Sequence, residues 1–244
     1  MSKAAENEEE YSEIIGICEE AQKLTLPDAH QQYFDRLQAW ALNKRGEARA
    51  EQAAELSDAE QIAQLDQAAL ADFDAAVKLQ PQMAIAVHNR GVSLAAAGKH
   101  ELATKDFARA IELNPKYANS WFNRGELHYQ AGRMQAAIAD YSRAIQLQPQ
   151  DAGAFNSRGN AQYLAENYQA ALADFGQAIR LAPRDPLGYA NRGDAYSDLG
   201  YWERGINDYR KSLELAPQLT RAKQGMAWVL ATCPHSNIRD AELA

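Results

Sequence analysis

The sequence is poor in the residues that build most metal and catalytic sites. Cysteine occurs only twice in 244 residues, as Cys18 and Cys233, and no C-x-x-C is present. This spacing argues against a zinc ribbon or a disulfide framework, so we expect two reduced, buried thiols. The five histidines are scattered, and His100-Glu101 does not begin an H-E-x-x-H motif. We therefore predict no metal, no cofactor, no catalytic residue and no enzymatic activity.

Long apolar runs are absent, and positive charge is in deficit. No stretch approaches the ~18 apolar residues of a membrane span, and residues 1–10 are acidic rather than signal-like. Lys and Arg number 25 against 33 Asp and Glu, which gives a formal net charge of -8. Nucleic-acid binding needs a basic surface, whereas an acidic one permits basic partners. We expect a cytoplasmic protein that binds neither membrane nor nucleic acid.

The strongest pattern that is present is a repeat of 34 residues. Prolines recur at this interval, and an Arg-Gly pair stands at a fixed distance after each of the first four. Each block also carries a small residue, an aromatic and a small residue, as in Ala137, Tyr141 and Ala144. The prolines are Pro81, Pro115, Pro149, Pro183 and Pro217, and the glycines are Gly91, Gly125, Gly159 and Gly193. A period of this length is typical of stacked helical units.

This arrangement resembles the tetratricopeptide-repeat (TPR) family over about residues 39–231, in a bacterial form with Asn-Arg-Gly repeats. The resemblance implies an all-α fold, a right-handed superhelical solenoid of antiparallel helix pairs. The spacing of Ala103, Phe107 and Ala110 independently predicts a second helix with one buried face. No repeat can bury such a face alone, so neighbouring pairs must stack.

The repeats divide the chain into segments. We expect an amphipathic capping helix from Glu10 to Leu24, ended by Pro27, and a helix start near Ser57, where Ser57 to Glu60 forms a capping box. Another helix is expected to begin at Ile238. The segments are an acidic disordered tail (1–9), a capping helix and lead-in (10–38), an elongated first repeat (39–83), four regular repeats (84–117, 118–151, 152–185, 186–219) and a capping helix with a partial repeat (220–244).

Each repeat carries one arginine before its glycine and one aspartate before its aromatic. We predict that the two side chains pair between the helices of a repeat, and a ladder of arginines that binds an anionic ligand is the rival hypothesis. The pairs are Arg45 with Asp72, Arg90 with Asp106, Arg124 with Asp140, Arg158 with Asp174, and Arg192 with Asp208.

The resemblance implies that first helices line a concave groove. Asn89, Asn123 and Asn191 would form a row there, interrupted by Ser157, similar to an asparagine ladder that grips a peptide backbone. We expect these positions to be exposed; alternatively, the amides satisfy neighbouring helix ends. The other predicted groove residues are Phe122, Glu126, Tyr129, Asn160, Tyr163 and Asp194.

A second TPR binding mode, the carboxylate clamp for chaperone tails, is only partly matched. Asn160, Asn191 and Arg221 fit it, but Asn156 stands where the resemblance requires Lys, and Gly225 where it requires Arg. We therefore predict a scaffold whose partner is a protein or an extended neutral or basic peptide. The alternative is a self-assembling scaffold, a homo-oligomer that forms through exposed terminal helices.

Overall fold

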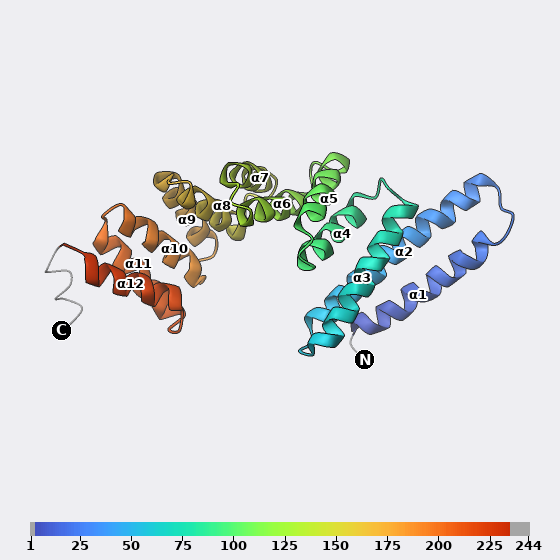
Figure 1. Cartoon of the computed structure of the whole chain (residues 1–244), viewed down its shortest axis with the longest axis horizontal. Coiled ribbons are helices and arrows are strands. Elements are labelled where there is room, and N and C mark those ends of the chain that lie inside the picture. The colour runs from blue at the N-terminus through green and yellow to red at the C-terminus, as the bar shows by residue number, and fades with distance from the viewer. Residues whose placement is uncertain (1–2, 235–244) are drawn as a thin grey trace. The chain divides into compact units, whose positions relative to one another are not determined.

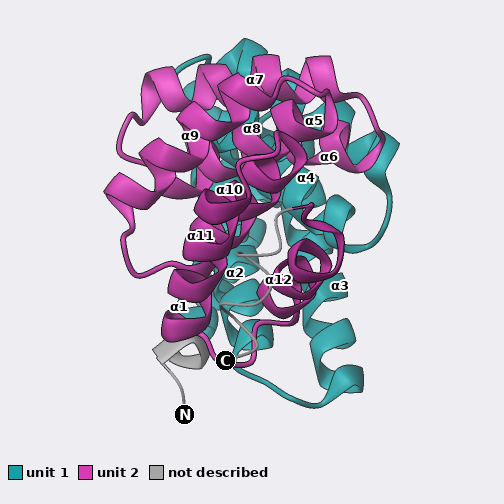
Figure 2. Cartoon of the chain, turned by 90° about the vertical axis from the view of Figure 1, so that its left-hand side faces the viewer, with its two compact units in different colours: residues 1–124 teal, residues 125–244 magenta. Residues whose placement is uncertain are grey.

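The computed structural model describes residues 3–234, and within them it contains twelve α-helices and no strand (Figure 1). This confirms the predicted all-α class. The chain forms two compact units, residues 1–124 and 125–244, and the boundary falls inside α6 (Figure 2). The helices are α1 (Lys3–Gln22), α2 (Asp28–Ala54), α3 (Ala59–Leu79), α4 (Ala84–Ala96), α5 (His100–Leu113), α6 (Ala118–Gln130), α7 (Met134–Leu147), α8 (Ala152–Leu164), α9 (Tyr168–Leu181), α10 (Pro186–Asp198), α11 (Trp202–Leu215) and α12 (Thr220–Thr232).

Within each unit the helices pack as consecutive pairs. In unit 1, α2 contacts α1 and α3, and α4 contacts α5. In unit 2, α8 packs against α9 and α10 against α11, and α12 lies on α10 and α11. The regular repeats thus follow the predicted 34-residue spacing of helix pairs.

The contact inside each pair is a glycine pressed against an aromatic ring. A Cβ atom on Gly159 would lie 2.6 Å from Cε1 of Phe175, and one on Gly193 would lie 2.8 Å from Cε1 of Tyr209. Both rings are fully buried. Any side chain at these glycines would force the helices apart, which explains the invariable glycine in the repeats of this chain.

The turn inside each regular repeat needs a left-handed residue. Gly98 and Gly132 both have φ of 72°, and Gly200 has φ of 77°. The corresponding residue of the third repeat is Glu166, with φ of 61°. The backbone N–H groups of Glu166 and Asn167 donate to Tyr163 O and Gln162 O, which closes the end of α8 as the glycines close theirs.

The N-terminal region differs from the expected boundaries. Residues 3–9 are not a disordered tail, because α1 begins at Lys3 and Glu8 binds Arg49 of α2 at 2.7 Å. The helix ends at Gln22, and Pro27 caps the start of α2 instead of ending α1. A proline is tolerated at a helix start because the first amides have no intrahelical partner.

The first helix pair is correspondingly longer than expected, since α2 begins at Asp28 rather than at residue 39. Its turn lies near Ser57 as predicted, but the capping residue is Asp58, whose carboxylate accepts from the amide of Gln61 at 2.8 Å. Cys18 and Cys233 are both buried, as expected from the sequence. The helix expected from Ile238 lies outside the described residues.

Candidate functional site

Four of the predicted Arg–Asp pairs are present as two-pronged ion pairs between the helices of a repeat. In the last regular repeat, Arg192 donates from Nε to Oδ2 of Asp208 at 2.7 Å and from Nη2 to Oδ1 at 2.8 Å. Arg45–Asp72, Arg90–Asp106 and Arg158–Asp174 have the same geometry, with N–O distances of 2.6 to 3.0 Å. These arginines are committed to structure, which disfavours an anion-binding ladder. Arg124 and Asp140 belong to different units, and their pairing stays a prediction.

Sequence reasoning missed that two of these arginines, Arg158 and Arg192, also lie over an aromatic ring. The Arg158 guanidinium lies 5.6 Å from the ring centre of Phe155, and that of Arg192 lies 6.0 Å from Tyr189. The Tyr189 hydroxyl in turn donates to Pro183 O at 3.2 Å. The signal was available, because an aromatic stands three residues before the arginine in three repeats and this spacing puts both on one helix face.

In unit 1, the predicted asparagine row is part of a polar cluster between first helices. The Asn89 side-chain amide donates to Asn43 Oδ1 at 3.0 Å and to Glu47 Oε1 at 2.9 Å. Asn89 therefore bridges α4 to α2 rather than satisfying a helix end. Asn123 and Phe122, on the part of α6 that belongs to unit 1, are half-buried.

In unit 2, the expectation of an exposed asparagine is wrong. Asn191 is only 3% exposed, and its amide donates to Asn156 Oδ1 at 2.9 Å, joining α10 to α8. Its own Oδ1 is buried without a donor. The side chain is thus enclosed where α10 meets α8 and is not exposed to a ligand. Asn160 and Tyr129 are half-buried on α8 and α6.

Two predicted acidic groove residues accept hydrogen bonds from the core. The buried Tyr141 hydroxyl donates to Glu126 Oε1, and the buried Tyr209 hydroxyl donates to Asp194 Oδ1, both at 2.7 Å. Burial and the adjacent carboxylate raise the pKa of both tyrosines, so each hydroxyl keeps its proton and remains a donor. Each of these two carboxylates is therefore held in place by a hydroxyl group from the buried core.

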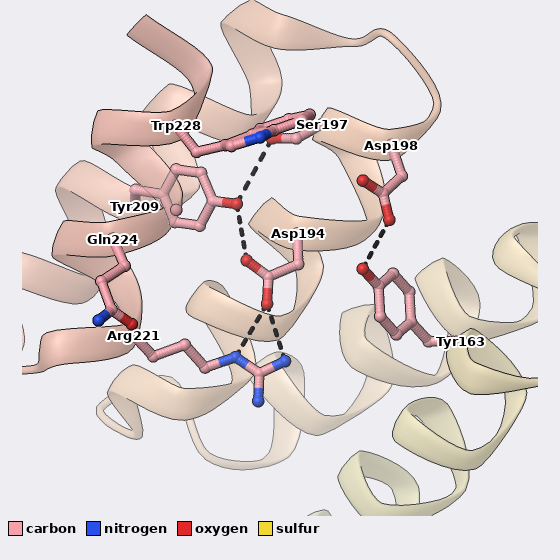
Figure 3. A pocket seen from close by; sticks show the side chains of 9 residues that line it. Tyr163, Asp194, Ser197, Asp198, Tyr209, Arg221, Gln224 and Trp228 are labelled. Atoms are coloured by element: carbon pink, nitrogen blue, oxygen red, sulfur yellow. Dashed lines mark hydrogen bonds and ion pairs between the residues drawn. The ribbon is translucent and has the colours of Figure 1, made fainter. Parts of the chain in front are cut away.

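Unit 2 contains a hollow of about 310 Å³ formed mainly by the first helices α8, α10 and α12 (Figure 3). Figure 3 shows the Tyr209 hydroxyl and the Arg221 guanidinium converging on Asp194, while Tyr163 points toward Asp198. The lining residues are Tyr163, Asp194, Ser197, Asp198, Tyr209, Arg221, Gln224, Gly225 and Trp228. Asp194 and Asp198 each contribute one negative charge and Arg221 contributes one positive charge, so the hollow has a formal net charge of one negative unit.

The hollow unites only part of the predicted site. Tyr163 and Asp194 line it, and the Tyr163 hydroxyl donates to Asp198 Oδ2 at 2.6 Å. Glu126, Tyr129 and Asn160 are not among its lining residues. Sequence reasoning missed Trp228, which is 48% exposed on α12, although Arg221, Gln224 and Trp228 recur at helical spacing and so share one face.

The described residues contain neither a candidate metal site nor a candidate membrane span. Residues 3–234 hold no group of three or more His, Cys, Asp or Glu side chains placed to bind a metal ion. Among the twelve helices in that range, none combines the length and the apolar character needed to cross a bilayer.

Two family models of a known helical repeat match parts of the sequence. The family model described as tetratricopeptide repeat matches residues 67–116 and 89–152, and a second model of the same description matches residues 188–219. No curated protein matches the sequence. The chain therefore carries tetratricopeptide repeats, as its 34-residue pattern predicted.

Solved structures agree on the fold. The TPR protein YrrB, described as having an unusual peptide-binding site, superposes with a TM-score of 0.61 at 18% identity, over 74% of this chain and 91% of that one. MamA gives 0.61 at 19% identity, over 67% and 97%. A thermophilic TPR protein of Thermus thermophilus, TTC0263, gives 0.56 at 19%, over 76% and 99%. These likenesses identify a TPR solenoid.

Proposed function

We propose that this chain is a protein-interaction scaffold that holds an extended neutral or basic peptide segment against the first helices of unit 2. The observation that carries the proposal is the hollow lined by Asp194, Asp198 and Trp228. An exposed indole supplies flat apolar contact, and carboxylates beside it supply acceptors for peptide N–H groups and for cationic side chains. YrrB, which has a peptide-binding site by description, has a similar fold and lends support.

Charge favours a basic ligand over an acidic one. The hollow carries one net negative charge, and the whole chain has a formal net charge of -8. Such a surface attracts cationic segments and repels acidic ones, more strongly at low salt. Four further expectations stay predictions. They are that the chain binds a partner and does not catalyse a reaction, that it is cytoplasmic, that it belongs to the bacterial Asn-Arg-Gly subtype, and that it binds neither nucleic acid nor membrane.

The test uses labelled peptides of alternating lysine and alanine, and of alternating glutamate and alanine, titrated at low salt by fluorescence anisotropy. We expect the lysine peptide to bind and the glutamate peptide not to bind. Trp228→Ala and Asp198→Asn should each weaken binding severalfold. Trp40→Ala on α2 and Glu203→Gln on α11 are matched controls, because each removes the same kind of exposed side chain outside the hollow. Equal binding by all four variants would place the site elsewhere.

The predicted residues of the rest of the row need a separate test. If Asn89, Asn123 and Phe122 also hold the peptide, their replacement by alanine should weaken capture of the same lysine peptide. Asn89→Ala and Asn123→Ala are preferable to Asn191→Ala, because Asn191 is buried and its loss would also disturb the α8–α10 contact. The same comparison applied to Glu126→Gln and Tyr129→Ala decides whether α6 takes part.

Self-assembly is the second candidate, and one observation favours it. Large apolar side chains of the N-terminal helices are exposed, among them Ile17 and Leu24 near the end of α1 and Tyr33 on α2. Exposed apolar groups gathered on terminal helices are the kind of surface that a second copy could cover.

A further inference from the structure

Arg221 forms an ion pair in the hollow that differs from the four pairs inside the repeats. Its Nε and Nη2 groups both donate to one oxygen, Oδ2 of Asp194, at 2.8 Å. The other oxygen, Oδ1, accepts from Tyr209. In the repeat pairs, by contrast, Nε and Nη2 meet two different oxygens of the aspartate, as between Arg192 and Asp208.

The two kinds of pair also differ in exposure. The side chains of Arg221 and Asp194 are 47% and 19% exposed, against 23% and 10% for Arg192 and Asp208. An ion pair this exposed is screened by solvent and contributes little to stability. Arg221 therefore does not need to stay on Asp194 for the unit to remain folded, and its long flexible stem can move into solvent.

Asp194 remains aimed into the hollow whether or not Arg221 is bound. The Tyr209 hydroxyl holds Oδ1 from the buried side, and the Tyr209 ring is fixed between Gly193 and Gly225, where a Cβ atom would lie 2.8 and 2.6 Å from ring atoms. Oδ1 of Asp194 is thus held by the Tyr209 hydroxyl, while Oδ2 binds the Arg221 guanidinium, which another cation can replace.

We propose that Arg221 is an internal competitor that occupies, on Asp194, the position of a basic side chain of the ligand. This inference rests on the proposed function and adds a determinant of specificity to it. A basic peptide gains Asp194 only by displacing Arg221, whereas a neutral peptide leaves the pair intact and contacts Asp198 and Trp228 alone. Arg221 consequently narrows the difference in affinity between basic and neutral ligands.

The experiment compares Arg221→Gln with Arg184→Gln, using the lysine–alanine and glutamate–alanine peptides and a neutral serine–alanine peptide at low salt. Arg184 is an exposed arginine of unit 2 outside the hollow, so its variant corrects for the general loss of one positive charge. We expect Arg221→Gln to tighten binding of the lysine peptide by about three- to fivefold relative to Arg184→Gln, the upper end of the range set by an exposed ion pair. Binding of the serine peptide should change less than twofold or so by the same reasoning.

Other results overturn the inference in distinct ways. If the parent binds the lysine peptide and Arg221→Gln binds it equally or more weakly, Arg221 is not a competitor, although the proposed function survives. If the parent binds the glutamate peptide and Arg221→Gln loses that binding, Arg221 is an anion contact. If neither protein binds the lysine peptide, the inference fails, and if neither binds the serine peptide either, the proposed function fails as well. Arg221→Met, which keeps an apolar stem on α12, replaces Arg221→Gln if circular dichroism shows a loss of helix.

Discussion

His88 is a titratable side chain buried in the interior of unit 1. It is buried on α4, its Nδ1 lies 2.9 Å from the Ser120 hydroxyl, and its ring packs against Phe107 and Tyr117. Burial disfavours the charged form and lowers the pKa of His88 to about 4. The imidazole is therefore neutral at pH 7 and packs in the interior of unit 1.

This shift makes stability depend on pH in a defined direction. Because the folded pKa lies below the unfolded value of about 6.5, the unfolded state binds a proton first as pH falls. The His88 contribution is fully present above about pH 6.5 and is lost between there and about pH 4. From pH 7 to 5 we expect a loss of about 2 kcal/mol in the free energy of unfolding.

Urea unfolding at the two pH values checks the prediction. His88→Gln, which does not titrate, should show a smaller loss, while His30→Gln, at an exposed position, should behave like the parent. Equal pH dependence in the parent and His88→Gln would contradict the burial argument.

Glu166 occupies a backbone conformation that the other regular repeats give to glycine. Its φ of 61° costs a residue with a side chain about 1–2 kcal/mol. We expect Glu166→Gly to raise the free energy of unfolding by up to about 1 kcal/mol, since part of the gain is offset by the greater entropy of an unfolded glycine. Gly132→Ala should lower it by a similar amount. Thermal unfolding of both variants measures the pair, and a stabilised Gly132→Ala would refute the account.

At the scale of the helix pair, the glycine against the aromatic ring sets the distance between helices. Gly159→Ala should destabilise by about 1–3 kcal/mol, because the new Cβ would lie 2.6 Å from the Phe175 ring. Gly176→Ala, on the partner helix α9, meets only the flexible end of Arg180 at 3.9 Å and should be neutral or stabilising by up to about 1 kcal/mol. Chemical unfolding of both proteins gives the contrast; two equal effects would mean that helix propensity alone matters.

The Arg192–Asp208 pair links α10 to α11, and its energy is accessible to a double-mutant cycle. Arg192→Ala and Asp208→Ala should each destabilise by about 2–4 kcal/mol, because the remaining charge loses its partner while mostly shielded from water. The double variant should lose less than the sum, with a coupling of about 0.5–3 kcal/mol. The outcome that contradicts pairing is strict additivity.

At the scale of the molecule, the two candidate functions predict different solution behaviour. A peptide-binding scaffold keeps one molar mass on dilution, whereas self-assembly through terminal helices makes the mass rise with concentration. We expect light scattering to give a constant mass, and Ile17→Ser with Leu24→Ser to leave it unchanged. A mass that rises in the parent and falls in that variant would favour the self-assembling scaffold.

Features that recur in each repeat could be predicted from the sequence, whereas features that occur only once could not. The 34-residue spacing located the regular helix pairs, and the Arg–Asp spacing located four ion pairs, because both recur in register. The start of α1 could not be found this way, since the contact of Glu8 with Arg49 joins positions 41 residues apart that no repeat relates. Likewise, the burial of Asn191 depends on how α10 packs against the helices around it.

The hydroxyl of Tyr209 links the buried core of unit 2 to the hollow, through its hydrogen bond to Asp194. When a repeat exchanges Phe for Tyr, an acceptor directly after its glycine can bind the new hydroxyl, as Asp194 after Gly193 binds that of Tyr209, whereas Ser197 Oγ lies farther away, at 3.5 Å. The reverse exchange would release the carboxylate and let it swing. A substitution buried between two helices of such a repeat would therefore change how firmly a negative charge is held at the hollow.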